Sequence, residues 1–167
     1  MDKIYLIGFM GSGKTSVGKK LARKLEYDFI DLDSEIQKYV NQSVSEYFDK
    51  YGEERFRIIE QKILRDTFRL SKTVIATGGG TPCFFDNINE INENGFSIYL
   101  KADSKTLINR LLNAKEERPL LKNKKSEDLE IYIDNLLSER ESFYLQANLI
   151  AEAKDINLDT ILDRIRF

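Results

Sequence analysis

The run Gly8-Phe9-Met10-Gly11-Ser12-Gly13-Lys14-Thr15 constrains the fold of this chain more than any other segment. It matches the pattern G-x-x-x-x-G-K-[ST], follows an apolar run at 4–7, and precedes apolar residues at helical spacing over 14–25. In such a strand–loop–helix unit the glycines let backbone N–H groups surround a phosphate, and the helix points its positive end at the same place. The pattern predicts a phosphate-binding loop; the alternative is a glycine-rich turn with a chance Lys-Thr.

The side chains of this loop indicate a nucleotide with its metal ion. Lys14 offers a positive charge to the β- and γ-phosphates, and the Thr15 hydroxyl is a ligand for Mg²⁺. The residues predicted to bind the nucleotide are Gly11, Ser12, Gly13, Lys14, Thr15 and Ser16.

Composition excludes several chemistries. The 167 residues contain no His and a single Cys, Cys83, so Ser-His or Cys-His catalysis, imidazole metal sites and an internal disulfide are excluded. The net charge of -2 argues against a nucleic-acid partner. No apolar run reaches the ~18 residues of a membrane span, and the N-terminal run is too short for a signal peptide. We therefore expect a cytoplasmic protein, and a monomer because no long heptad run demands a partner.

Apolar runs typical of strands alternate with helical patterns, which indicates an α/β fold with a parallel sheet. The length fits one domain spanning 1–167. The expected strands lie at 4–7, 29–33, 73–76, 96–100 and 149–151. The expected helices lie at 14–25, over most of 34–71, at 104–113, after residue 126 and at 159–167.

Two carboxylates, Asp31 and Asp33, end the second expected strand. Residues i and i+2 of a strand share a face, and ligands of α/β proteins bind at the carboxyl ends of the strands. One Asp is therefore predicted to serve the metal and the other an acceptor hydroxyl; the alternative is an Asp that caps the next helix. The third strand, 73–76, lacks the Asp that holds Mg²⁺ in most phosphate-loop proteins, which favours Asp31 in that role.

Two arginines are candidate anion-binding residues. Arg140 falls on the apolar face of its helix, so it needs an anionic partner, either a buried protein carboxylate or a substrate carboxylate. That face is set by Leu129, Ile133 and Leu136. Arg57 has Glu53 four residues before it and Glu60 three after it, which alone indicates a solvated ion-pair array.

Two further motifs lie near the expected sheet edge. Thr77-Gly78-Gly79-Gly80 follows the third strand, and its glycines let a ligand lie against bare backbone; the alternative is a plain turn. Arg118, within the charged stretch 115–125, is a candidate to close over the phosphates like an arginine finger; the alternative is a solvated loop charge.

In this order, the motifs resemble those of the shikimate kinase family along essentially the whole chain. The resemblance rests on the phosphate loop, Asp31-Leu32-Asp33, residues 52–60, residues 77–80, residues 118–121, and Arg140 with Tyr144 four residues on. It implies a three-layer P-loop kinase fold whose five-stranded parallel sheet, in the order 2-3-1-4-5, is flanked by helices. It also implies ATP-dependent phosphorylation of the 3-hydroxyl of shikimate, in the pathway to aromatic amino acids, with Mg²⁺ as cofactor.

The resemblance also implies roles for single residues. Asp33 binds the acceptor hydroxyl and takes its proton, and Arg57 and Arg140 clamp the shikimate carboxylate. The remaining implied roles are catalysis and nucleotide binding by Lys14 and Arg118, ring contacts by Gly78, Gly79 and Gly80, and Mg²⁺ binding by Thr15 and Asp31. The segment 34–62 binds the substrate, and the segment 112–125 forms a lid.

One position departs from the family pattern, and two other functions stay open. The family has an Arg seven residues before the lid Arg, where this chain has Leu111, with Arg110 one residue away. The first alternative is another P-loop kinase, for a sugar acid or a nucleoside monophosphate; the Asp pair and the glycine run argue against it. The second is a nucleotide-binding switch without kinase activity, although no N-K-x-D guanine motif is present.

Overall fold

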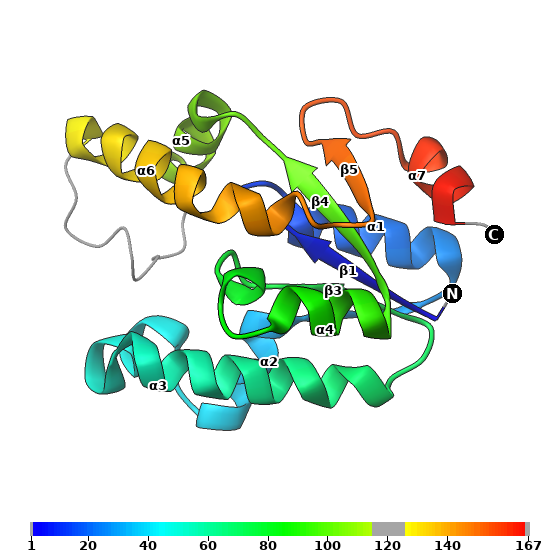
Figure 1. The fold of residues 1–167 in the computed structure, drawn as a ribbon, viewed down its shortest axis with the longest axis horizontal. Helices are drawn as coiled ribbons and strands as arrows, with labels where there is room; N and C mark the ends of the chain where they lie inside the picture. The colour runs from blue at the N-terminus through cyan, green and yellow to red at the C-terminus, as the bar shows by residue number, and fades with distance from the viewer. Residues whose placement is uncertain (1, 115–125, 166–167) are drawn as a thin grey trace.

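The computed structural model describes residues 2–114 and 126–165, in which a parallel sheet lies between layers of helices (Figure 1). The strands are β1 (Lys3–Ile7), β2 (Asp28–Asp31), β3 (Thr73–Ala76), β4 (Phe96–Lys101) and β5 (Leu149–Glu152). All neighbouring strands are parallel, in the order β2-β3-β1-β4-β5. The predicted α/β fold, strand order and fifth strand are confirmed.

The helices connect the strands as in successive β-α-β units. They are α1 (Lys14–Leu25), α2 (Leu32–Val40), α3 (Val44–Asp66), α4 (Asn87–Asn94), α5 (Ser104–Leu112), α6 (Ser126–Tyr144) and α7 (Leu158–Ile165). Two short 3₁₀ helices, η1 (Thr67–Arg69) and η2 (Thr81–Cys83), flank β3. Among the described residues, no helix combines the length and the apolar character needed to cross a membrane.

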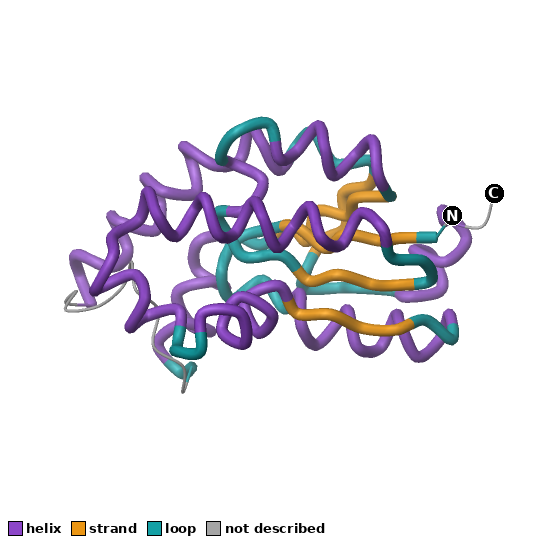
Figure 2. The backbone as a smooth tube through the Cα atoms, turned by 90° about the horizontal axis from the view of Figure 1, so that it is seen from below, coloured by secondary structure: helices purple, strands orange, loops and turns teal. Residues whose placement is uncertain are grey.

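The two faces of the sheet bury separate hydrophobic clusters, and the side chains of β1 alternate between them. Ile4 and Leu6 pack with α1 and α7, whereas Tyr5 and Ile7 pack with α2 to α6. All four side chains are fully buried, as expected of a central parallel strand. Figure 2 shows the strands as one layer with helices on both sides.

The register of β1 and β3 brings two glycine-rich segments together. Leu6 pairs with Ala76, and the next residue, Thr77, donates to the Leu6 carbonyl from both its backbone N–H (3.1 Å) and its hydroxyl (3.0 Å). The phosphate loop and residues 78–80 therefore leave the same sheet edge side by side.

The expected strand over 29–33 is wrong at its carboxyl end. Strand β2 ends at Asp31, and Asp33 lies in the first turn of α2, so the two Asp side chains do not share a strand face. The Asp31 carboxylate accepts a hydrogen bond from the Ser34 N–H (3.2 Å), which makes it the N-cap of α2. Helix α4 was not expected either, because only two isoleucines, Ile88 and Ile91, mark its buried face among Asn and Glu residues.

Helix α3 is kinked at Gly52, which has φ 81° and ψ 171°. Only glycine adopts this backbone region without strain. The kink separates a first segment of α3, which carries Phe48, from a second segment, which carries Arg57 and Glu60. The helix therefore bends around the acceptor side of the site described below.

We expect Gly52→Ala to lower the free energy of unfolding by about 1–3 kcal/mol, although the added Cβ would meet no atom within 4 Å. The loss comes from backbone strain alone. Urea denaturation measures it, with Lys50→Ala on the exposed surface of the same helix as the control. Equal free energies of unfolding in the two variants would show that alanine adopts the backbone conformation of residue 52 without strain.

Candidate active site

The phosphate loop has the backbone of an anion site. Gly8, Gly11 and Gly13 have φ angles of 144°, 82° and 96°, which glycine alone adopts readily. The N-cap of α1 is Gly13, which has no side chain to accept from the first N–H groups of the helix, and the first turn of α1 contains no acidic residue. The positive end of the helix therefore faces the loop uncompensated. Lys14 is buried and donates from Nζ to the Gly8 carbonyl (2.7 Å) and the Phe9 carbonyl (2.9 Å), which places its charge inside the loop.

Thr15 and Asp31 meet beside this loop. The Thr15 hydroxyl donates to Asp31 Oδ2 at 2.7 Å, while Oδ1 of the same carboxylate caps α2. Asp31 is therefore a helix cap, which was one alternative from the sequence. It is also the partner of the loop threonine, so capping the helix leaves the other alternative, a role beside the metal, open.

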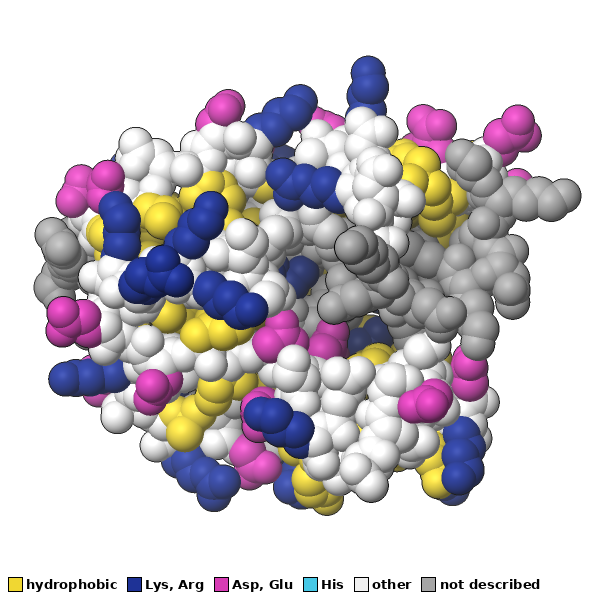
Figure 3. Space-filling view, turned by 180° about the vertical axis from the view of Figure 1, so that it is seen from behind, with side chains coloured by type: hydrophobic (Ala, Val, Ile, Leu, Met, Phe, Trp, Pro, Cys, Tyr) yellow, Lys and Arg dark blue, Asp and Glu magenta, His cyan; other side chains and the backbone are white. Residues whose placement is uncertain are grey.

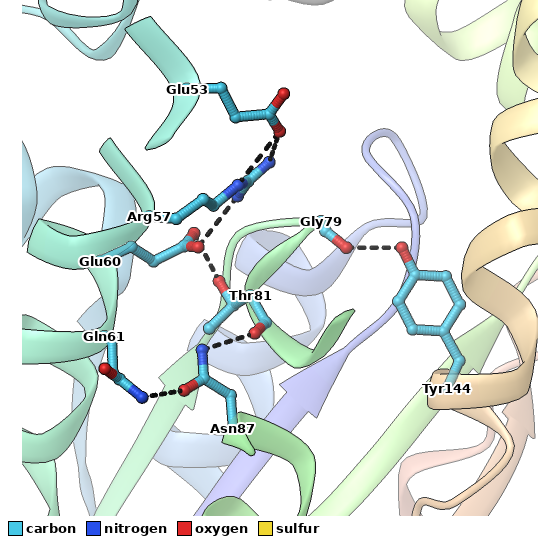
Figure 4. A network of polar contacts seen from close by, with 8 residues as sticks. All are labelled: Glu53, Arg57, Glu60, Gln61, Gly79, Thr81, Asn87 and Tyr144. Atoms are coloured by element: carbon cyan, nitrogen blue, oxygen red, sulfur yellow. Dashed lines mark hydrogen bonds and ion pairs between the residues drawn. The ribbon is translucent and has the colours of Figure 1, made fainter. Parts of the chain in front are cut away.

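Arg57 lies at the centre of a buried polar network that Figure 4 shows. It donates from Nη1 to Glu60 (2.9 Å) and from Nε and Nη2 to Glu53 (3.3 and 3.0 Å). Burial would lower the pKa of Arg57, but the carboxylates of Glu60 and Glu53 outweigh it and raise that pKa. The interpretation as a solvated array is therefore wrong: the ion pairs form, but the side chains of Arg57 and Glu60 are 6% and 1% exposed.

The network continues from Glu60 to the segment that follows β3. Glu60 accepts from the Thr81 hydroxyl (2.8 Å), and Asn87 donates to the Thr81 carbonyl (2.8 Å) and accepts from Gln61 (3.3 Å). The Phe84 ring covers the Arg57 guanidinium, 4.1 Å from its Cζ. The guanidinium is therefore held by two carboxylates and by the Phe84 ring, with the Phe56 ring farther away at 5.2 Å.

Arg140 is also buried, which confirms the inward orientation predicted from its spacing. Its guanidinium lies near the Phe9 ring, 5.7 Å from the ring centroid. Unlike Arg57, it makes no ion pair within 4.0 Å to a carboxylate of the described residues, and its Nη1 has no hydrogen-bond partner there.

Two connected cavities bring these residues together. A cleft of about 1110 Å³ is lined by the phosphate loop with Ser16, by Asp31 and by Arg110, and a smaller cavity of about 70 Å³ is lined by Arg57, Glu60, Gly80 and Arg140. Residues lining both are Met10, Asp33, Val44, Gly78 and Gly79. Figure 3 shows a hollow on this face of the molecule, with acidic and basic side chains at its edges. Asp33 thus lies where the phosphate side meets the Arg57 side.

The glycines of 78–80 are required by close packing. A Cβ on Gly80 would lie 2.5 Å from Arg57 Nη2, and a Cβ on Gly78 would lie 2.9 Å from Glu60 Oε2 and 3.2 Å from Asp33 Oδ1. A Cβ on Gly79 would lie 3.1 Å from the Met10 nitrogen and 3.4 Å from Arg140 Nη1. Protein atoms therefore require glycine at these positions, and the predicted contact of a ligand with this bare backbone stays a prediction.

The structure also shows what three other residues contact. Arg110 donates to the Gly11 carbonyl (3.1 Å), and Leu111 packs against Gly11, so both touch the phosphate loop. Cys83 packs at the edge of the core, and burial raises the pKa of its thiol to about 11, which keeps it protonated. Arg118 and most of the expected lid lie outside the described residues.

Sequence reasoning missed the roles of Glu60, Thr81 and Phe84 in holding Arg57. One signal was available: the apolar residues Phe56 and Leu64 lie four residues before and after Glu60, so helical spacing places Glu60 on the inward face of α3. The contacts of Thr81 with Glu60 and of Phe84 with Arg57 depend on how η2 packs against α3. The sequence pattern does not predict that packing.

Comparison with known proteins agrees with this geometry. The family model described as shikimate kinase matches residues 10–166. A shikimate kinase from Azobacteroides pseudotrichonymphae is 43% identical over 166 residues, which are 99% of this chain and 98% of that protein.

Solved structures resemble the whole chain. A crystal structure of shikimate kinase from Bacteroides thetaiotaomicron is 38% identical with a TM-score of 0.90, covering 98% of this chain and 96% of that one. Shikimate kinase from Acinetobacter baumannii, in complex with shikimate, is 31% identical with a TM-score of 0.88, covering 99% and 90%. The chain therefore belongs to the shikimate kinase family of phosphotransferases.

Proposed function

We propose that this chain transfers the γ-phosphate of ATP to the 3-hydroxyl of shikimate. The observation that carries the proposal is a pair of buried donors without partners among the described residues, Ser12 Oγ and Arg140 Nη1. A buried polar group left unpaired is expensive, so each is expected to meet a ligand atom. Ser12 lies in the phosphate loop and Arg140 in the smaller cavity, which suits a phosphate at one end and a carboxylate at the other.

The two arginines contribute differently to binding the carboxylate. The charge of Arg57 is already balanced by Glu53 and Glu60, whereas Arg140 brings a positive charge that no carboxylate of the described residues balances within 4.0 Å. We infer that Arg140 supplies most of the charge recognition and that Arg57 fixes the orientation of the acid. The amide groups of Gly79 and Gly80 donate to no protein acceptor among the described residues, which leaves them for the ring of the substrate.

We propose that Asp33 takes part in the transfer step, which its position in the lining of both cavities supports. The 3-hydroxyl oxygen attacks the γ-phosphorus, the bond from that phosphorus to the β–γ bridging oxygen breaks, and ADP leaves. The hydroxyl proton passes to the Asp33 carboxylate. Lys14 and the amino end of α1 hold the charge on the phosphate oxygens, which is the main requirement of phosphoryl transfer.

The residues beside the phosphate loop fit Mg²⁺. Thr15 Oγ1 and Asp31 Oδ2, 2.7 Å apart, are hard oxygen ligands in the cleft. Mg²⁺ keeps several waters and takes few protein ligands besides substrate phosphates. Thr15 and Asp31 would therefore hold it, partly through water, and the ion would neutralise charge on the β- and γ-phosphates.

The other sequence assignments stay predictions. We propose that residues 34–62 form the substrate-binding segment, because α3 carries Val44 and Phe48 from its first part and Arg57 from its second part to the smaller cavity. The lid over 112–125, with Arg118 closing on the phosphates, rests on family resemblance. The cytoplasmic location and the monomeric state rest on the sequence features given above.

A coupled ADP-release assay with ATP and Mg²⁺ tests the proposal, with shikimate compared against gluconate, CMP and AMP. ADP release only with shikimate is expected. Turnover of another acceptor in place of shikimate would keep the phosphate loop and overturn the acceptor site. Silence with all four, with ATP still bound, would indicate a nucleotide-binding switch.

Asp33→Asn removes the proton acceptor while keeping the size of the side chain. We expect kcat to fall by at least about 100-fold, because general-base catalysis contributes that much or more. The dissociation constant of ATP, measured by calorimetry, should stay close to that of the parent chain. Asp28→Asn, at the exposed amino end of β2, is the control. Near-normal kcat in Asp33→Asn would remove Asp33 from the reaction.

Arg140→Met should separate function from stability. We expect KM for shikimate to rise at least about tenfold, because truncating a buried charge that binds a partner charge costs that much or more. The free energy of unfolding should stay equal or rise, because the substitution removes a buried charge with no carboxylate partner among the described residues. Steady-state kinetics and urea denaturation measure the two effects; a large loss of stability would show that Arg140 has a structural partner.

Arg57→Met should behave differently, because it leaves Glu60 buried without its cation. We expect a loss of about 3–5 kcal/mol in the free energy of unfolding, together with a raised KM for shikimate. Arg55→Met, on the exposed side of the same helix, is the matched control. An unfolding free energy equal to that of the control would mean that Glu60 does not depend on Arg57.

A further inference from the structure

The three carbonyl groups of residues 78–80 are held in two different ways. The Gly78 carbonyl accepts from the Thr81 N–H (3.2 Å) and the Gly80 carbonyl from the Cys83 N–H (2.9 Å), both within the local turn. The Gly79 carbonyl instead accepts from the hydroxyl of Tyr144, which comes from the end of α6 (2.5 Å, Figure 4). The middle glycine is therefore held by a side chain that is 65 residues away in the sequence.

Gly79 touches both halves of the site. A Cβ at this position would lie 3.1 Å from the backbone nitrogen of Met10, in the phosphate loop, and 3.4 Å from Arg140 Nη1. A small movement of Gly79 would therefore change the distance between the phosphate loop and the guanidinium of Arg140.

Tyr144 is a rigid support for this glycine. Its side chain is fully buried, and its ring packs on Tyr99 with the centroids 5.0 Å apart. Burial raises the pKa of the Tyr144 phenol more than the neighbouring, hydrogen-bonded guanidinium of Arg140 lowers it, so the hydroxyl stays a donor at neutral and moderately alkaline pH. Tyr144 also follows Arg140 by one turn of α6, so one helix carries both the anion-binding side chain and the support.

We propose that Tyr144 is a positioning residue for the phosphoryl transfer: its buried hydroxyl holds the Gly79 carbonyl and thereby sets the spacing between Arg140 and the phosphate loop. The inference rests on the proposed function, because it concerns the same acceptor site. It predicts that the acceptor is bound less tightly and less well aligned without this hydroxyl. In the proposed function ATP binds the phosphate loop and the amino end of α1, to which Tyr144 makes no hydrogen bond among the described residues, so we expect ATP binding to stay unchanged.

Tyr144→Phe tests this role, because it removes one oxygen and keeps the ring. We expect KM for shikimate to rise about tenfold, the scale of one lost hydrogen bond to a buried group, with KM for ATP unchanged. Tyr99→Phe is the matched control, because Tyr99 is equally buried in the same ring pair but its hydroxyl bonds to Glu141. Tyr99→Phe should leave both KM values unchanged.

Two variants at the same position keep the test decisive even if Tyr144→Phe folds poorly. Replacing Tyr144 by 4-aminophenylalanine keeps a donor at the same ring position, and 4-methylphenylalanine fills the same volume without a donor. Recovery of KM for shikimate by the amino group but not by the methyl group supports the positioning role. Equal KM values in these two variants would overturn it, because the donor would then be irrelevant.

The outcomes separate the two proposals. A parent chain that releases no ADP with shikimate contradicts the proposed function itself. A parent chain that is active, with KM for shikimate unchanged in Tyr144→Phe or with both KM values raised equally, contradicts the positioning role alone.

Discussion

The Leu6 carbonyl accepts two hydrogen bonds from Thr77, and the arrangement of the site depends on this contact. It locks the carboxyl ends of β1 and β3 together at the point where both strands become loops. The phosphate loop and the glycine turn at 78–80 therefore cannot separate, and Asp33 lines the cavities on both sides of them. A donor phosphate and an acceptor hydroxyl can meet here because two adjacent parallel strands end in registration.

The buried charges near this contact are of two kinds, those that are paired with an opposite charge and those that are not. Arg57 is buried with Glu60, and such a pair is stable only while both members remain. Arg140, equally buried, has no carboxylate within 4.0 Å among the described residues, and Ser12 Oγ is likewise unpaired. Unsatisfied buried donors destabilise a fold, so their position on the two sides of Asp33 supports the proposal that ligand atoms pair with them. The hydrogen-bond network around Glu60 holds Arg57 in place without a ligand.

Much of this architecture could be predicted from the sequence, because local patterns determine it. The phosphate loop needs only glycines, a lysine and a threonine between a strand and a helix, and the inward side of Arg140 follows from helical spacing. The predicted end of β2 was two residues too late, because the sequence is equally compatible with Asp33 in a strand and with Asp33 in the first turn of a capped helix. The burial of Glu60 and the covering of Arg57 by Phe84 depend on how η2 folds against α3, which local patterns do not determine.

Phosphoryl transfer asks a protein mainly for position and positive charge, and this fold supplies both from its backbone. The amino end of α1 gives a fixed positive potential, and the glycines let amide groups and side chains approach within contact distance. Tyr144 and Thr77 donate hydrogen bonds to this backbone directly, and Glu60 accepts one from the side chain of Thr81 next to it, so these segments are held before a substrate binds. The proposed transfer needs no histidine, because its proposed proton acceptor, the carboxylate of Asp33, lines both cavities.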